Sequence, residues 1–236
     1  WPVNIDECEW KTPDRLTPPI RSSEAVGAIR VEMKAPQGSS FQQLGMKNLR
    51  FFINAESNLA HTIYELIFSN CIQVVVRDPG NPRTPAVILR PDECIRPVGF
   101  RPEESMLPYP RRSFDGYRLL QEYFAFPEKF LFFELSGLEA AWQKGIKDRA
   151  EIIFLFSQFE FSERRQNLEL GVNNKTLRLN CTPIINLFRQ TAEPILLDQR
   201  RYEYPVVPDI RRPMATEVFS IEDVVSIDTQ TQEVLR

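Results

Sequence analysis

Few residues in this sequence could carry catalytic chemistry. His61 is the only histidine among 236 residues, so a Ser–His–Asp or Cys–His site would have to be built on it. It lies at the start of a predicted helix, on the side away from Ile63 and Leu66, and no serine or cysteine stands in a motif with it. Neither a glycine-rich phosphate motif nor HExxH occurs. We therefore predict that the chain is not an enzyme, has no catalytic residue and binds no cofactor.

Adjacent acidic residues are the remaining groups that could act in hydrolysis or hold a metal. The pairs are Asp92 with Glu93, Glu103 with Glu104, and Glu222 with Asp223. Neighbouring residues on a strand point to opposite faces, and acids on loops are usually solvated. A carboxylate-based hydrolase stays open as an alternative. So does a carbohydrate-binding β module, which would expose aromatic side chains on a concave face.

The four cysteines show no spacing typical of a metal site. Cys71 precedes IQVVV and Cys181 precedes TPIINL, which are apolar contexts, and the others are Cys8 and Cys94. Free cysteines are among the most buried residue types. We expect reduced, buried thiols, no disulfide scaffold and no metal.

Two apolar, proline-bracketed segments, 98–130 and 179–213, are more informative. Loops rich in Leu, Phe, Tyr, Pro and Arg are typical of protein–protein contact surfaces, and arginine is favoured in interface ion pairs. The alternative is a loop folded onto its own core. We predict assembly contacts in 98–128 and 182–213. The candidate interface residues are Tyr109, Arg111, Arg112, Tyr117, Arg200, Arg201, Tyr202, Tyr204, Arg211 and Arg212.

The composition is that of a folded globular protein, with 42% hydrophobic and 26% charged residues. Phenylalanine, with 17 copies, has no polar handle, which favours packed cores and dry interfaces. A net charge of −3 argues against a nucleic-acid partner. No apolar run reaches the ~18 residues of a membrane-spanning helix, so we expect no membrane insertion. The chain opens without Met or a signal peptide, and we interpret it as an internal piece of a longer protein.

Hydrophobic periodicity predicts mostly strands. Ile29, Val31 and Met33 alternate with charged residues, which is typical of a half-buried strand over 28–35. The further predicted strands are 49–56, 71–78, 86–90, 129–137 and 151–158, and a helix is expected at 59–70.

The stretch YFAFPEKFLFFEL (123–135) is the densest apolar run. Its first residues continue a predicted helix, YRLLQEYFAF, in which the side chains of Tyr117, Leu120, Tyr123 and Phe124 share a face. Pro127 ends this helix, because it has no amide donor and clashes with the preceding turn. The following strand has apolar residues on both faces, as a buried strand requires.

Strand pairs repeat at an offset of about 21 residues, at 28–56 and 129–158. We predict a mainly β fold with minor α (α+β), in two tandem β-rich, sandwich-like units at 25–95 and 127–190. An extended lead-in (1–24), a proline-rich crossing with a short helix (96–126) and an extended, edge-strand tail (191–236) complete the predicted organisation.

Several long strings carry a resemblance to a known family. They are GYRLLQEYFAFPEKFLFFEL, LNCTPIINLFRQTAEPILLD, EYPVVPDIRRP and EVFSIEDVVSI, with LRFFINAE followed by TIYELIFSN earlier in the chain. In this order they resemble TssF (VasA/ImpG-like), the baseplate wedge subunit of the bacterial type VI secretion system. The resemblance covers nearly the whole chain.

The resemblance implies a structural subunit, similar in architecture to the wedge proteins of contractile phage tails. The implied partners are TssG, TssK, a second TssF copy and the baseplate hub that supports sheath and tube assembly. The implied location is the cytoplasm, attached to the membrane-anchored secretion complex. The family offers no catalytic motif, which agrees with the search above.

Overall fold

The computed structural model describes residues 1–236 except 111, 160–161, 199, 228–233 and 236, and it leaves the side chains at 162–164 and 234–235 undescribed. The chain divides into two compact units, unit 1 (1–184) and unit 2 (185–236). The buried hydrophobic residues of the described chain all belong to unit 1.

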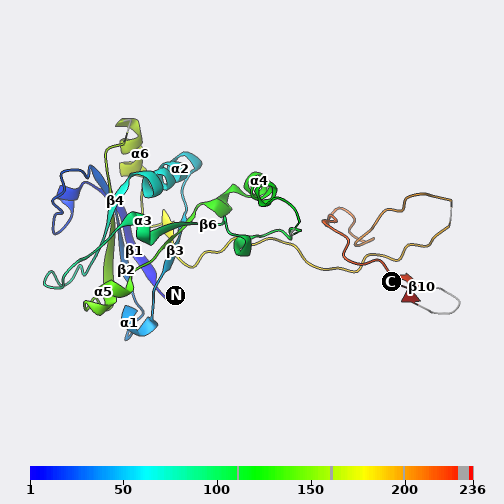
Figure 1. Ribbon diagram of the computed structural model, residues 1–236, viewed down its shortest axis with the longest axis horizontal. Helices are drawn as coiled ribbons and strands as arrows, with labels where there is room; N and C mark the ends of the chain where they lie inside the picture. The colour runs from blue at the N-terminus through cyan, green and yellow to red at the C-terminus, as the bar shows by residue number, and fades with distance from the viewer. Residues whose placement is uncertain (111, 160–161, 199, 228–233, 236) are drawn as a thin grey trace. The chain divides into compact units, whose positions relative to one another are not determined.

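Unit 1 is built on two antiparallel sheets (Figure 1), with few helices. The five-stranded sheet consists, in spatial order, of β1 (Asn4–Lys11), β2 (Gly27–Lys34), β8 (Arg149–Phe156), β4 (Cys71–Arg77) and β5 (Val87–Leu89). The four-stranded sheet consists, in spatial order, of β6 (Ile95–Val98), β7 (Phe132–Leu135), β3 (Leu49–Ile53) and β9 (Leu177–Arg178). The predicted mainly β fold with minor α is confirmed.

The middle of the five-stranded sheet follows from its apolar pattern. β8 is apolar on both faces, with Phe154 in the main core and Ile153 and Leu155 in a second cluster behind the sheet. A strand of this kind needs neighbours on both edges and cover on both faces. β2 and β4 flank it, and Leu16 packs in the second cluster.

Aromatic rings join the two sheets. Phe51 of β3 and Phe133 of β7 stack with ring centroids 5.1 Å apart. Both meet Phe154 of β8 edge to face, at 6.3 and 5.8 Å. All three rings are fully buried. The phenylalanine-rich run predicted as a core strand therefore packs in the interior of the sandwich.

Short helices lie at the ends of the sheets (Figure 1). α1 (Phe41–Leu44) contacts α5 (Glu139–Gln143), while α2 (Ser57–Glu65) contacts α6 (Ser162–Gly171). α2 continues into a π-helical turn over Leu66–Asn70. α3 (Pro91–Cys94) precedes β6, and α4 (Asp115–Ala125) lies in the connection from β6 to β7. The 3₁₀ turns are η1 (Pro13–Arg15), η3 (Pro102–Glu104) and η4 (Pro127–Phe130). No described helix combines the length and apolarity needed to span a membrane.

The expected tandem units at 25–95 and 127–190 do not match the strand order. β2 pairs with β8 and β3 pairs with β7, so each sheet takes strands from both ranges. The reason is that the connections from β2 to β3 and from β7 to β8 each cross from one sheet to the other. The repeated pattern therefore reflects two crossings within a single sandwich.

The predicted lead-in (1–24) also differs from expectation, because it contains β1. This strand lies at the edge of the five-stranded sheet and buries only Cys8 and Trp10 among its alternating residues. Glu7 and Glu9 instead form ion pairs with Arg30 of β2, at 2.6 and 2.8 Å. Acidic residues at these positions hide the apolar alternation that marks a strand.

Unit 2 holds one small sheet, β10 (Ser226–Ile227) paired with β11 (Val234–Leu235). From 185 to 225 its described residues form no helix or strand. Isolated polar links connect this stretch: the Glu193 amide donates to Val207 O at 2.8 Å, and Arg189 pairs with Glu222 at 3.0 Å. The extended tail remains a prediction.

Candidate functional site

α4 is the helix that the sequence predicted before Pro127. It begins after Phe114, whose backbone is extended, and ends at Phe126, directly before the proline. The helix has 11 residues, and an isolated helix of this length is marginal in water. Contacts with the rest of unit 1 must therefore hold it.

A buried ionic cluster, formed by Arg118, Glu122 and Lys129, anchors α4. Each of these side chains is at most 2% exposed. Glu122 Oε2 accepts hydrogen bonds from Arg118 Nη1, at 3.0 Å, and from the Lys129 ammonium. Arg118 Nη2 also donates to Phe100 O at 3.3 Å. The cluster fastens the helix to the chain before it and after it.

The other oxygen of Glu122 fixes the preceding loop. Oε1 accepts hydrogen bonds from the amides of Met106 and Leu107, at 2.8 and 3.2 Å, and from Ser105 Oγ at 3.3 Å. Burial raises the pKa of Glu122, but the hydrogen bonds from Lys129 and the two amides outweigh this effect and hold the pKa below 4.5. One ionised carboxylate thus joins α4, its loop and η4.

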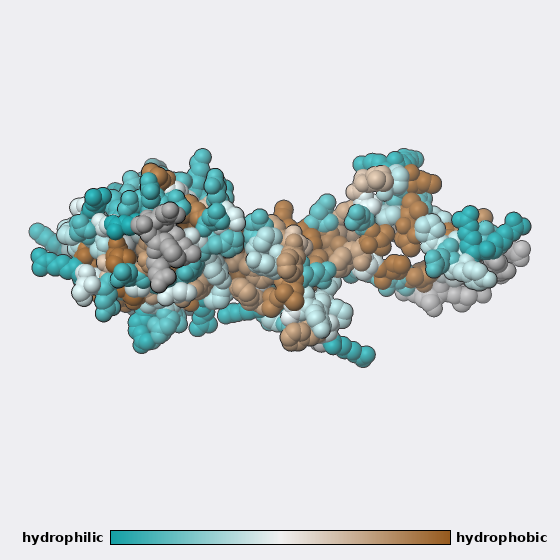
Figure 2. All heavy atoms as spheres, turned by 90° about the horizontal axis from the view of Figure 1, so that it is seen from above, coloured by the Kyte–Doolittle hydropathy of each residue, from teal (hydrophilic) through white to brown (hydrophobic). Residues whose placement is uncertain are grey.

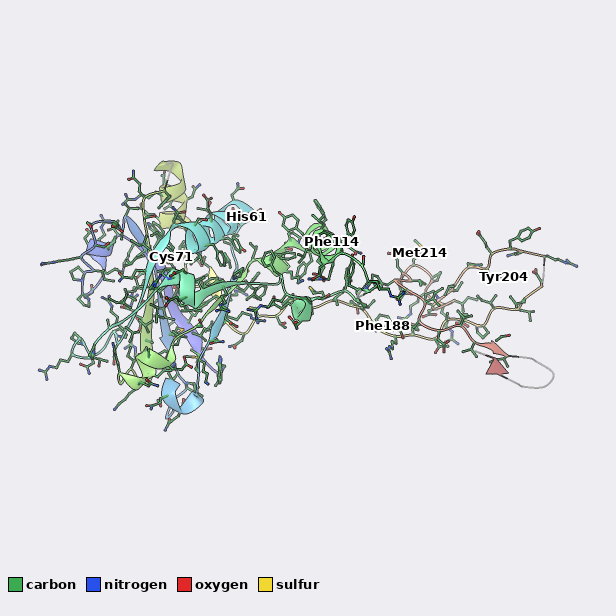
Figure 3. All side chains as sticks on the ribbon, viewed as in Figure 1. His61, Cys71, Phe114, Phe188, Tyr204 and Met214 are labelled. Atoms are coloured by element: carbon green, nitrogen blue, oxygen red, sulfur yellow. The ribbon has the colours of Figure 1, made fainter. Side chains whose placement is uncertain are left out.

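The opposite side of the helix, which we term the α4 apolar face, consists of Phe114, Tyr117, Leu120, Tyr123 and Phe124. These side chains are 47–80% exposed. Apolar atoms lie open on the surface in the part of Figure 2 that corresponds to α4, and Figure 3 labels Phe114 at its start. The predicted shared face exists and points to solvent, while the charged residues point inward. Contiguous exposed apolar surface marks interaction sites, so the candidate site is an assembly interface.

The predicted interface residues around α4 have different surroundings. The Tyr109 hydroxyl lies 2.8 Å from Ser113 Oγ and donates to Phe114 O at 3.0 Å, so it braces the start of the helix. Tyr117 belongs to the exposed face, and Arg112 is exposed. Arg111 lies outside the described residues. Their roles as contacts remain predictions.

The other predicted interface residues belong to unit 2. Tyr202 is fully exposed, and the Tyr204 hydroxyl donates to Asp198 Oδ1 at 2.6 Å. The Arg200 amide donates to the same oxygen at 3.0 Å, and the Arg212 guanidinium pairs with Asp209 at 3.4 Å. The remaining candidates, Arg201 and Arg211, are exposed. These residues also remain predicted contacts.

The candidate catalytic groups have local partners. His61 lies on α2 (Figure 3), and its Nδ1 is 2.7 Å from Ser57 O in the same helix. Asp92 and Glu93 pair with Arg90, at 2.7 and 3.0 Å. Among the residues with described positions, no group of three or more His, Cys, Asp or Glu could hold a metal ion. The structure does not bring the histidine and the carboxylate pairs into a shared site.

The cysteines have free thiols, and Cys8 and Cys94 are buried as predicted. Burial raises the pKa of Cys8 and Cys71 to about 12 and that of Cys94 to about 11. The thiolate is the reactive form of cysteine, so these three side chains are protonated near neutral pH and are poor nucleophiles.

Sequence reasoning missed Arg118, Glu122 and Lys129 as the support of the site. A signal was present, because Arg118 and Glu122 stand at i and i+4, the spacing at which helical side chains meet. The pair also lies opposite the aromatic stripe. Amphipathic helices usually bury their apolar side, which makes the inverted orientation hard to anticipate.

Comparisons with known proteins were made against families, curated sequences and solved structures. The family described as "Type VI secretion system, TssF" matches residues 1–236. The chain is 33% identical over 227 residues to the "Type VI secretion system component TssF1" of Pseudomonas aeruginosa, which covers 95% of this chain and 35% of that protein. It therefore spans about a third of the length of this curated relative.

A solved structure shares the fold. It is a chain of the type VI secretion system TssK-TssF-TssG baseplate subcomplex, determined by cryo-electron microscopy. The TM-score is 0.71 at 23% sequence identity, and the match covers 96% of this chain and 39% of that chain.

Proposed function

This chain belongs to the TssF family of the type VI secretion system, and on that premise we propose that it is a structural part of the secretion baseplate wedge. Its role is to hold neighbouring subunits in place and so to support sheath and tube assembly. The family membership favours this role over a carboxylate-based hydrolase or a carbohydrate-binding module. In this proposal the chain carries out no catalysis.

The observation that carries the proposal is the α4 apolar face above its buried ionic cluster. Phe124 is 80% exposed while Arg118 on the opposite side is 1% exposed. Burying such a side chain in an interface gains roughly 1.5–3 kcal/mol relative to leaving it in water. A helix built with this orientation is stable in unit 1 and still has apolar surface available for a neighbour.

The proposed partners are TssG, TssK, a second TssF copy and the baseplate hub. The solved relative comes from a complex that contains TssK and TssG, which supports the first two. We place the protein in the cytoplasm, attached to the membrane-anchored secretion complex. The contacts are assigned to 98–128 and 182–213, with the arginine doublets pairing with acids on neighbouring subunits.

Charge reversal tests the assigned contacts better than truncation does. A rim salt bridge contributes only about 0–1 kcal/mol, whereas like-charge apposition costs several. We expect Arg211→Glu with Arg212→Glu, and separately Arg111→Glu with Arg112→Glu, to leave the chain folded and to lower its co-purification with TssG or TssK. Arg83→Glu with Arg90→Glu, on exposed positions outside both segments, is the control. If the chain binds neither TssG nor TssK, the baseplate role is wrong.

A further inference from the structure

We propose that α4 is the inserted element of an interface, a pre-formed helix whose aromatic face enters a concave apolar groove with a basic rim on a partner chain. The inference rests on the proposed baseplate function and adds the kind of surface that the helix fits.

The spacing of the exposed side chains fits insertion into a groove. Tyr117, Leu120 and Phe124 stand at i, i+3 and i+7, the pattern by which an apolar groove recognises a helix. On an ideal helix, the first and last of these lie about 20° apart around the axis and about 10.5 Å along it. The three side chains are 64%, 56% and 80% exposed. A face this open is convex, so the partner must supply the concave surface.

The helix is already ordered before any partner binds. The bonds of Glu122 to Arg118, Lys129 and the Met106 amide hold the backbone. Edge-to-face ring pairs restrain the side chains, at 5.6 Å between Phe114 and Tyr117 and at 5.6 Å between Tyr123 and Phe124. A pre-organised ligand loses less conformational entropy on binding, so α4 is suited to act as a rigid anchor.

The exposed charges around the helix select the rim of the groove. From Asp115 to Phe130 both cations, Arg118 and Lys129, are buried, while the acids Asp115 and Glu128 are exposed. The exposed Arg112 lies before this span. Complementary charge at an interface speeds association and suppresses wrong partners. A groove that receives α4 should therefore carry Lys or Arg near its edges.

The central test replaces one anchor and compares it with a matched leucine. Leu120→Asp places a charge in the middle of the proposed contact. Leu170→Asp makes the same change on α6, where the leucine is 78% exposed. Binding of each variant to purified TssG and to purified TssK is measured by biolayer interferometry. We expect Leu120→Asp to weaken the partner that holds the groove by at least about tenfold, and Leu170→Asp to leave binding unchanged.

Two further variants separate packing from charge. Tyr117→Ala with Phe124→Ala removes anchors without adding charge and should weaken the same partner by at least about tenfold. Glu128→Lys should slow association with it several-fold, since rim charges act mainly on the association rate. Unchanged binding by both anchor variants, while the unmodified chain binds, overturns the proposal and leaves the baseplate role intact. Faster association of Glu128→Lys overturns the basic rim. Failure of the unmodified chain to bind either protein overturns the baseplate role and this inference together.

Discussion

At the scale of single residues, Glu122 is the side chain on which the candidate site depends. It receives two cations and two backbone amides, and it is 2% exposed. Such a carboxylate is stable in the interior only because every partner is present. Removing its charge leaves Arg118 and Lys129 buried without an anion.

We predict that Glu122→Gln destabilises the segment around α4. Breaking a buried ion pair from one side typically costs about 3–5 kcal/mol. Hydrogen exchange should show faster exchange of the Met106 and Leu107 amides, which lose their acceptor. Glu128→Gln changes an exposed acid nearby and serves as the control. Unchanged protection at both amides would show that the carboxylate does not hold the loop.

Stability should also depend on pH through Glu122. Its pKa lies below 4.5 in the folded state, so its contribution is fully present above pH 4.5 and is lost as the pH falls through the folded-state pKa. The difference in unfolding free energy between the unmodified chain and Glu122→Gln should therefore be largest near neutral pH. Urea unfolding in steps below pH 4.5 should show that difference shrinking. A constant difference would contradict the ion-pair explanation.

At the scale of secondary-structure elements, β7 and α4 show the same residue type in opposite settings. Phe133 of β7 is fully buried between the sheets, whereas Phe124 of α4 is 80% exposed. The two elements are separated only by η4, so local composition does not distinguish them. What differs is whether a second layer covers the face.

The matched substitutions Phe133→Ala and Phe124→Ala measure this difference. Phe133→Ala removes a ring that packs on Phe51 and Phe154 and should lower the unfolding free energy by about 3–5 kcal/mol. Phe124→Ala should change it by less than about 0.5 kcal/mol, as surface substitutions usually do. The measurement is urea unfolding followed by circular dichroism. Equal losses would mean that Phe124 is covered in the isolated chain.

At the scale of the whole molecule, the two units differ in how they are stabilised. Unit 1 contains the sandwich core, whereas every large hydrophobic residue recorded as exposed from Ile185 to Ile227, such as Leu196 and Met214 at 84% and 98%, lies open to solvent. Figure 2 shows apolar side chains on the surface of unit 2 as well. Burial of apolar surface is the main favourable term in folding, so unit 1 should determine the stability of the chain.

We predict that a chain ending at Ile184 melts within about 2 °C of the complete 236-residue chain. Calorimetry of both forms provides the comparison. Brief proteolysis of the longer form should cut unit 2 first, because irregular segments with few buried contacts open easily. A large drop in melting temperature on truncation would show that unit 2 contributes to the core.

The sequence by itself determined the strand at 28–35, the end of a helix at Pro127 and the buried strand with Phe133, because these depend on local periodicity and on the backbone chemistry of proline. It also placed Tyr117, Leu120 and Phe124 on one helix face. Only the tertiary structure decided that β2 pairs with β8, since strand pairing is a contact between distant residues that two similar patterns cannot specify. It also decided that the α4 face points to solvent. Periodicity shows which side chains share a face, whereas what covers that face depends on the neighbouring elements, and here Glu122 turns the charged side inward.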